Sequence, residues 1–139
     1  MPTLEITTMI GCPLMCNFCP QENLRVKYGE DTKYMSLDTF KTALSKIPSD
    51  TRIDFSGMAE AWVNPEATNM LRYAFVQNFR VSIYTTLYNW TVDTAQEVAE
   101  LLEYRPEVGG SCLVWKKKAA KNTVLGARAG RRQKFGYWE

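Results

Sequence analysis

The chain has 139 residues, a formal net charge of +2, 45% hydrophobic and 12% aromatic residues, which suits one soluble globular domain with a moderate core. It contains no histidine, which excludes Ser–His and Cys–His catalysis, His-ligated zinc and imidazole acid–base chemistry. No apolar run approaches the ~20 residues of a membrane span and no signal peptide opens the chain, so we expect a cytoplasmic protein without membrane contact.

Strands alternate with amphipathic helices along the first hundred residues. Leu4 and Ile6 alternate with polar neighbours and predict a strand over residues 3–8. Ser36 is typical of a helix N-cap. It precedes one apolar helical face, made of Leu37, Phe40, Leu44 and Ile47. Residues 52–56 then predict a second strand.

A second helix is expected to begin at Asn64 and Pro65, because Asn caps helices well and Pro suits the first helical position. Its predicted buried stripe is Ala67, Met70, Leu71, Ala74 and Phe75. A third strand over residues 80–86 leads to a helix capped by Thr91, whose inward residues should be Val92, Ala95, Ala99 and Leu102. A fourth strand over residues 108–115 is a weaker prediction, since two glycines lie in it.

This order of elements predicts an α/β fold built from βαβ units around a parallel sheet. In such folds ligands bind at the carboxyl ends of the strands. The segments that directly follow the first three predicted strands are residues 11–20, 57–60 and 85–89. We therefore expect these three segments to meet at one edge of the sheet.

Cys12, Cys16 and Cys19 stand in the spacing CxxxCxxC. In a cytosolic chain such clustering favours a metal or catalytic site over disulfides. Iron–sulfur clusters are normally held by four cysteines, so three would leave one iron open to a small molecule. A three-cysteine zinc site lacking its fourth ligand and buried thiols without metal are the alternatives. Cys112 is far along the chain and is expected to be a buried or free thiol, because one cysteine cannot hold a second cluster.

The CxxxCxxC loop, with Phe18 just before the last cysteine, resembles the signature of the radical S-adenosylmethionine (radical SAM) enzymes. The resemblance implies a [4Fe–4S] cluster on the three thiolates, with SAM bound at the open iron. Reductive cleavage would then give methionine and a 5′-deoxyadenosyl radical. The resemblance also places Phe18 against the adenine side of SAM, with local packing over the cluster as the alternative. It implies an external reductant such as flavodoxin or ferredoxin.

A second motif follows the second strand and resembles the family's glycine-rich GGE motif: Gly57, Met58, Ala59 and Glu60. It departs from that motif by placing Met and Ala beside the glycine. The resemblance implies that this segment binds the methionine end of SAM and that Glu60 pairs with its ammonium group. A solvated Glu in a strand-to-helix turn is the alternative. A third, looser match follows the third strand, and it would either contact the ligand or cap the turn and the next helix: Thr85, Thr86 and Asn89.

The likeness spans roughly residues 3–105 and is nearest to radical SAM members of the SPASM type, which continue into a longer barrel. The family core is a partial (β/α)6 barrel, whereas this chain holds about three to four β/α units. We therefore expect a truncated partial barrel over residues 1–107, followed by a basic, irregular segment over residues 108–139.

Charge also changes near this boundary. Residues 1–115 carry nine Lys or Arg and fourteen Asp or Glu, whereas residues 116–139 carry eight Lys or Arg and one acid. Three explanations are open: a fragment with an altered boundary, a minimal member completed by forming a homodimer, and a functional basic arm.

The sequence thus favours a radical SAM enzyme, or its cluster- and SAM-binding part, with no catalytic residue assigned. Its substrate is open between a peptide, an RNA and a small molecule. The competing hypotheses are a non-catalytic iron–sulfur protein and a nucleic-acid-binding module. The latter would use the basic tail to neutralise phosphates and its aromatic residues to stack on bases: Phe135, Tyr137 and Trp138.

Overall fold

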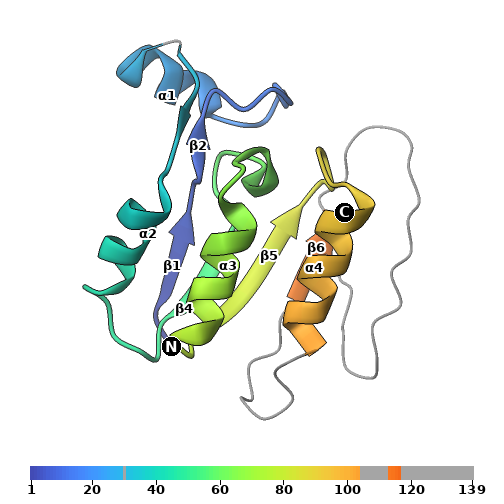
Figure 1. The fold of residues 1–139 in the computed structure, drawn as a ribbon. Coiled ribbons are helices and arrows are strands. Elements are labelled where there is room, and N and C mark those ends of the chain that lie inside the picture. Colours follow the sequence, from blue (N-terminus) through green and yellow to red (C-terminus); the bar gives the residue numbers. More distant parts are fainter. Residues whose placement is uncertain (30, 104–112, 117–139) are drawn as a thin grey trace.

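Parallel strands form the main sheet of the protein in the order β1-β4-β5-β6 (Figure 1). The computed structural model describes residues 1–29, 31–103 and 113–116. The strands are β1 (Thr3–Ile6), β4 (Arg52–Phe55), β5 (Arg80–Thr85) and β6 (Leu113–Lys116). Because Ile6 pairs with Phe55 and Phe55 pairs with Ile83, the carboxyl ends of the first three strands lie level with one another. The first three predicted strands and their parallel arrangement are confirmed, although the first strand ends at Ile6 instead of residue 8.

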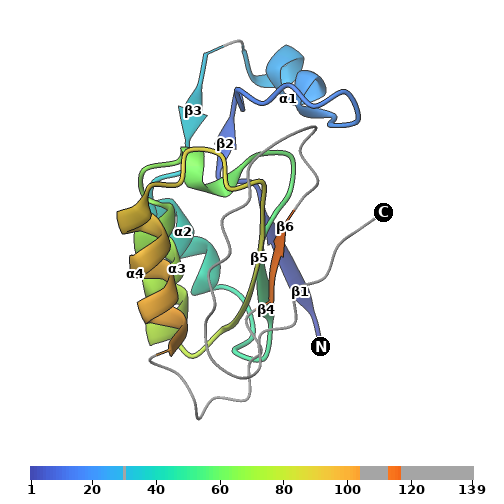
Figure 2. The same cartoon turned by 90° about the vertical axis from the view of Figure 1, so that its right-hand side faces the viewer.

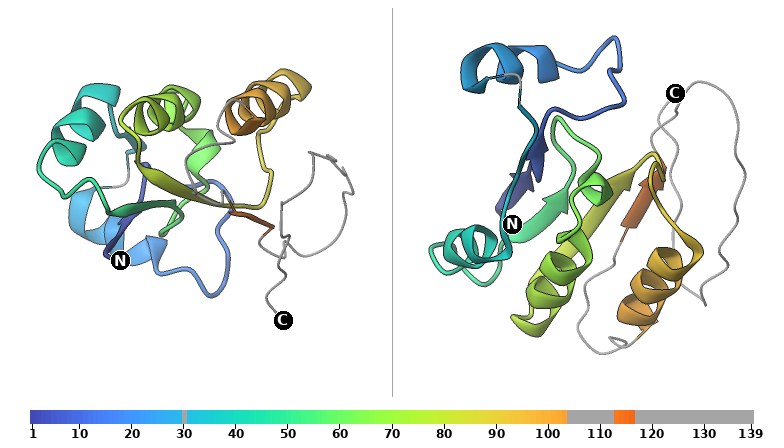
Figure 3. Two further views of the ribbon diagram at one scale, coloured as in Figure 1. Left: turned by 90° about the horizontal axis from the view of Figure 1, so that it is seen from below. Right: turned by 45° about the horizontal axis from the view of Figure 1, so that its top comes forward.

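Three helices cover one face of this sheet (Figures 2 and 3). They are α2 (Leu37–Leu44), α3 (Ala67–Val76) and α4 (Val92–Glu103). The core between the layers includes fully buried side chains from both: Phe40, Met70, Leu71, Ile53, Phe55, Val81 and Ile83. Burial of one such side chain contributes about 1.5–3 kcal/mol, so this layer contact accounts for much of the stability.

The predicted helical faces are largely correct, with one exception in α4. The stripe predicted for α3 is buried apart from Phe75, which packs against the core while partly exposed. In α4 the buried residue is Val98, whereas Val92 is 79% exposed. Val92 is the first residue of the helix.

Two of the predicted helix caps are present in the structure, and one predicted helix start is not. Ser36 Oγ accepts a hydrogen bond from Thr39 N at 3.1 Å, and Thr91 Oγ1 accepts one from Thr94 N at 3.1 Å, so both caps are confirmed. The predicted start of the second helix at Asn64 and Pro65 is wrong, because α3 begins at Ala67. Asn64 ends a short 3-10 helix, η1 (Ala61–Val63), and its Oδ1 accepts from Glu66 N at 2.9 Å.

An arm that the sequence analysis did not predict projects beyond the carboxyl ends of the strands (Figure 1). Its two short strands, β2 (Met9–Ile10) and β3 (Lys33–Tyr34), pair antiparallel. Helix α1 (Gln21–Tyr28) lies between them in the sequence. Two-residue strands and a mostly polar helix give no clear periodicity in a sequence. The cysteine-bearing loop lies within this arm.

Over the described residues the main sheet is open and does not close into a barrel. β6 overlaps the predicted fourth strand, whose first residues lie outside the described part of the chain. The same holds for nearly all of the basic segment and for Cys112. No helix among the described residues has the length and apolar character needed to cross a membrane.

Asn64 joins three parts of the fold, and its replacement should be costly. Its Nδ2 donates to the carbonyls of Thr8 and Met35, both at 2.9 Å, and the side chain is almost fully buried. Asn64→Ala should lower the free energy of unfolding by about 2–4 kcal/mol, because three hydrogen bonds of a buried side chain are lost. Urea denaturation measures this change. Asn69→Ala on the exposed side of α3 is the matched control, with an expected cost below about 0.5 kcal/mol; equal costs would contradict the prediction.

Candidate functional site

The three motif cysteines lie on the loop between β2 and α1, and all three line one cavity of about 350 Å³. Cys12 is buried, at 8% exposure, whereas Cys16 and Cys19 are half-buried. A turn closes the loop, with Cys19 N donating to Cys16 O at 2.9 Å. The three residues are not disulfide-bonded. The structure therefore brings the predicted metal ligands to one site.

The turn after β4 also lines this cavity, with Gly57, Met58, Ala59 and Glu60. Two of its backbone amides are held by the first strand and its extension: Gly57 N donates to Glu5 Oε1 at 2.8 Å and Met58 N to Thr7 Oγ1 at 3.2 Å. Because β1 and β4 are neighbouring parallel strands, these contacts fix the turn beside the chain that leads to the cysteines.

Backbone groups of this turn also contact the cysteines. Glu60 N donates to Cys12 Sγ at 3.5 Å, and Cys19 Sγ donates to Met58 O at 3.5 Å. The first bond suits a thiolate as well as a thiol, whereas the second needs the Cys19 proton. The two motifs that the sequence analysis singled out are thus in direct contact.

Glu60 is almost fully buried, at 3% exposure, and its carboxylate binds the end of β5. Thr85 Oγ1 donates to Oε1 at 2.5 Å, while Thr86 N and Thr86 Oγ1 donate to Oε2 at 2.7 and 2.8 Å. The alternative of a solvated Glu is therefore wrong. Glu60 and Thr86 nevertheless both line the cavity.

The segment after β5 organises its own turn. Thr85 Oγ1 accepts from Leu87 N at 2.9 Å and Thr86 Oγ1 accepts from Tyr88 N at 3.3 Å. Asn89 Nδ2 donates to Trp62 O at 3.4 Å and does not line the cavity. Thr85 and Thr86 thus cap the turn, as one of the two interpretations predicted, whereas Asn89 bonds to η1. Of the three residues, Thr86 alone lines the cavity.

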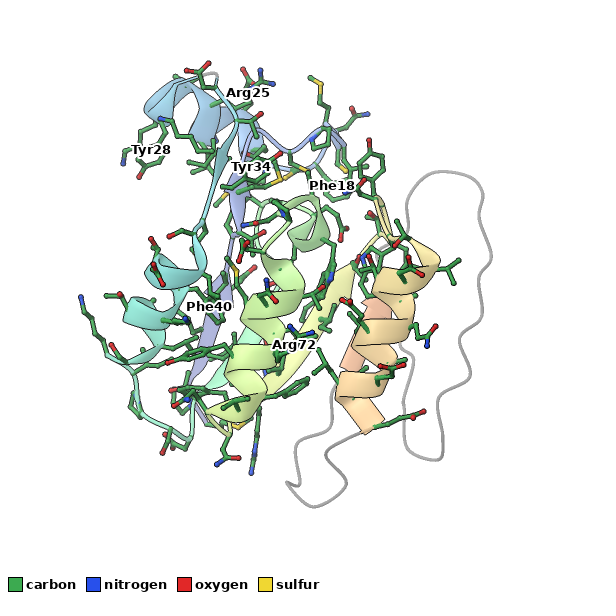
Figure 4. The ribbon with its side chains drawn as sticks, in the orientation of Figure 1. Phe18, Arg25, Tyr28, Tyr34, Phe40 and Arg72 are labelled. Carbon is green, nitrogen blue, oxygen red and sulfur yellow. The ribbon has the colours of Figure 1, made fainter. Side chains whose placement is uncertain are left out.

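Phe18 lies at the rim of the cavity on the cysteine loop (Figure 4). It is 81% exposed, and its neighbour on the loop, Met15, is 72% exposed. Contact with the adenine side of SAM and packing over the cluster both stay predictions for Phe18. A large apolar side chain exposed at a cavity rim is available to a ligand.

The sequence analysis missed the cavity residues that lie on α1: Gln21, Glu22 and Arg25. Gln21 is buried; its Oε1 accepts from Gly11 N at 3.1 Å and its Nε2 donates to Met58 O. It therefore ties the start of the cysteine loop to the turn after β4. Gln21 and Arg25 are four residues apart, so they would have been placed on one helical face had α1 itself been predicted.

The placement of the cysteines around the cavity distinguishes a site for a single metal ion from a site for a cluster. Among the described residues, no three Cys, Asp or Glu side chains are grouped so as to hold a metal ion. A cubane cluster attaches each thiolate to a different iron and so needs sulfurs distributed around a cavity. Three thiols lining one cavity fit that donor set.

The sheet face opposite the helices is polar next to this site. Arg52 Nε and Nη2 bind Asp54 Oδ1 and Oδ2 at 2.7 and 2.9 Å, and the hydrogen bond to Asp54 raises the pKa of Arg52. Burial raises the pKa of the Tyr84 phenol, and the charge of Asp54 raises it further. Tyr84 is therefore a neutral phenol at neutral pH. Because these side chains alternate with core residues along the strands, they lie on the helix-free face.

No family model, curated protein or solved structure matches this chain. The site is therefore described by its own geometry.

Gly57 is required by its backbone conformation and by its neighbour. Its φ is +73°, and a Cβ there would lie 2.2 Å from Thr7 Oγ1 and 3.2 Å from Thr7 Cα. Gly57→Ala should therefore lower the free energy of unfolding by about 2–3 kcal/mol, from left-handed strain plus the clash. Thermal or urea unfolding measures the change.

Gly29→Ala is the matched control for this prediction. Gly29 has a φ of +93°, but the nearest atom to its Cβ would be Lys33 Nζ at 3.9 Å, so strain acts there without a clash. We expect a cost of about 1–2 kcal/mol for this control. Adding Thr7→Ala to Gly57→Ala should recover part of the loss. A Gly57 variant no less stable than the Gly29 variant would contradict the role given to Thr7.

Proposed function

We propose that this chain is a radical SAM enzyme, or the cluster- and SAM-binding part of one. The observation that supports the proposal best is the meeting of two motifs around one cavity. Cys12, Cys16 and Cys19 line it, and so does the turn that ends in Glu60. A volume of about 350 Å³ is within the ~300–1,000 Å³ of small-molecule sites.

The three cysteines would hold a [4Fe–4S] cluster. When bound, the cluster with SAM would supply the electron and the 5′-deoxyadenosyl radical chemistry. The chain contributes a preformed hydrogen bond to one ligand, because Glu60 N already donates to Cys12 Sγ. Hydrogen bonds of this kind orient ligands and stabilise thiolate charge.

Glu60 would bind the ammonium group of SAM. A carboxylate offers about four acceptor positions, and Thr85 and Thr86 occupy three of them. The fourth acceptor position of the Glu60 carboxylate would accept from the ammonium group, and hydrogen bonds between two charged groups are strong. The threonines keep the carboxylate oriented and compensate its burial in the absence of a ligand.

Phe18 would stack on the adenine of SAM at the rim. Stacking of a base on an aromatic ring contributes about 1–3 kcal/mol. The polar sheet face would form the inner wall of a partial barrel, as in the resembling family. We further propose a cytoplasmic location, an external reductant of the flavodoxin or ferredoxin type, and a substrate that is a peptide, an RNA or a small molecule. A homodimer would complete the barrel.

Cluster loading tests the first part of the proposal. Anaerobic reconstitution with iron and sulfide should give a brown protein with about four irons per chain, as cubane stoichiometry requires. Replacing Cys12, Cys16 and Cys19 together by Ala should abolish loading, and iron and acid-labile sulfide analysis measures it. Cys112→Ala is the matched control and should load like the wild type. Loading that survives the triple replacement would overturn the proposal.

Binding and cleavage of SAM test the second part. Glu60→Gln should load the cluster but bind SAM about tenfold or more weakly, since a hydrogen bond to a charged group contributes ~1.5–3 kcal/mol. Glu100→Gln, on the exposed side of α4, is the control. Release of 5′-deoxyadenosine under dithionite should accompany binding in the wild type. A loaded wild type that neither binds nor cleaves SAM would instead indicate the non-catalytic iron–sulfur protein.

A further inference from the structure

Arg25 belongs to the cavity but has no assigned role. It lies in the last turn of α1 (Figure 4), one helical turn after Gln21. It lines the same cavity as the three cysteines. Residues four apart share a helical face. Because Gln21 is bonded to Gly11 N and Met58 O, that face of α1 is fixed toward the cysteine loop and the turn after β4.

The guanidinium of Arg25 is incompletely paired. Its Nε is buried and finds no hydrogen-bond partner among the described residues. The nearest carboxylate is Glu22, whose Oε2 is 4.0 Å from Nη1 and whose side chain is 73% exposed, against 29% for Arg25. A solvated pair at that distance contributes little, and it leaves Nε without an acceptor. A buried donor without a partner costs about 1–3 kcal/mol. Arg25 therefore brings to the cavity a guanidinium charge that its distant pair with Glu22, itself a lining residue, neutralises only weakly.

We propose that Arg25 is the charge-compensating residue of the iron–sulfur site, donating to its sulfur atoms and raising its reduction potential. This inference rests on the proposed function. One electron from a low-potential one-electron donor adds one negative charge to the site, with no bond or proton change at Arg25. A nearby guanidinium stabilises the more negative state, and net charge and hydrogen bonds to sulfur are the protein's means of setting such potentials.

The test is a redox titration of the reconstituted full-length chain without SAM, followed by electron paramagnetic resonance of the reduced cluster. Arg25→Gln should reduce the ratio of reduced to oxidised cluster at least tenfold at a fixed solution potential, equivalent to a midpoint ~59 mV lower. Arg25→Lys, which keeps the charge but not the planar fork, should fall between Gln and wild type. Arg72→Gln is the matched control, since Arg72 is exposed on α3 and bonded to Asn69, and its midpoint should be unchanged.

The outcomes separate this inference from the proposed function. Equal midpoints for wild type and Arg25→Gln, with equal iron content, would overturn the role of Arg25 while leaving the cluster in place. A midpoint that is unchanged while SAM affinity falls would also overturn it, assigning Arg25 to the ligand's carboxylate instead. A wild type that loads no cluster would overturn the proposed function and this inference together.

Discussion

Glu60 carries a carboxylate into the interior at the carboxyl end of the sheet, and three donors from Thr85 and Thr86 compensate it. A buried charge without such partners would destabilise the fold by several kcal/mol, so the ends of β4 and β5 are held at one separation. The same turn is bonded to Glu5 in β1 and to Thr7 just after that strand. Three neighbouring strands therefore end in one hydrogen-bonded unit, and the cysteine loop rests on it.

The sheet is covered by helices on one face and carries charged and hydroxyl groups on the other. A doubly wound fold needs apolar residues on both faces, because helices pack on each. Here Ile53 and Phe55 enter the helix-covered core, while Asp54 between them pairs with Arg52 on the opposite face. The sheet therefore lacks the second apolar face of a doubly wound fold, and Asp54 is accommodated on the polar face by its ion pair with Arg52.

The sequence indicated the parts of the fold that depend on local pattern. Ser36 and Thr91 cap helices because short hydroxyl side chains reach the first turn, and the apolar stripe of α3 follows helical spacing. The start of α3 was misplaced because Asn64 uses its side chain for long-range bonds to Thr8 and Met35, which no local rule contains. The meeting of the three post-strand segments was predictable from topology. Gln21 and Arg25 were not, since α1 has no apolar periodicity.

Hydrogen bonding around Met58 O shows how the site would accept a cluster without losing its frame. In the structure this carbonyl accepts from both Gln21 Nε2 and Cys19 Sγ. Ligation of iron would remove the Cys19 proton and with it the weaker, sulfur-donated bond. The bond from Gln21 would remain, so the Met58 carbonyl would keep a hydrogen-bond donor. Cys12 needs no rearrangement of this kind, because it accepts from Glu60 N in either state. The bonds that hold the loop to the sheet are thus those that deprotonation of the cysteines leaves intact.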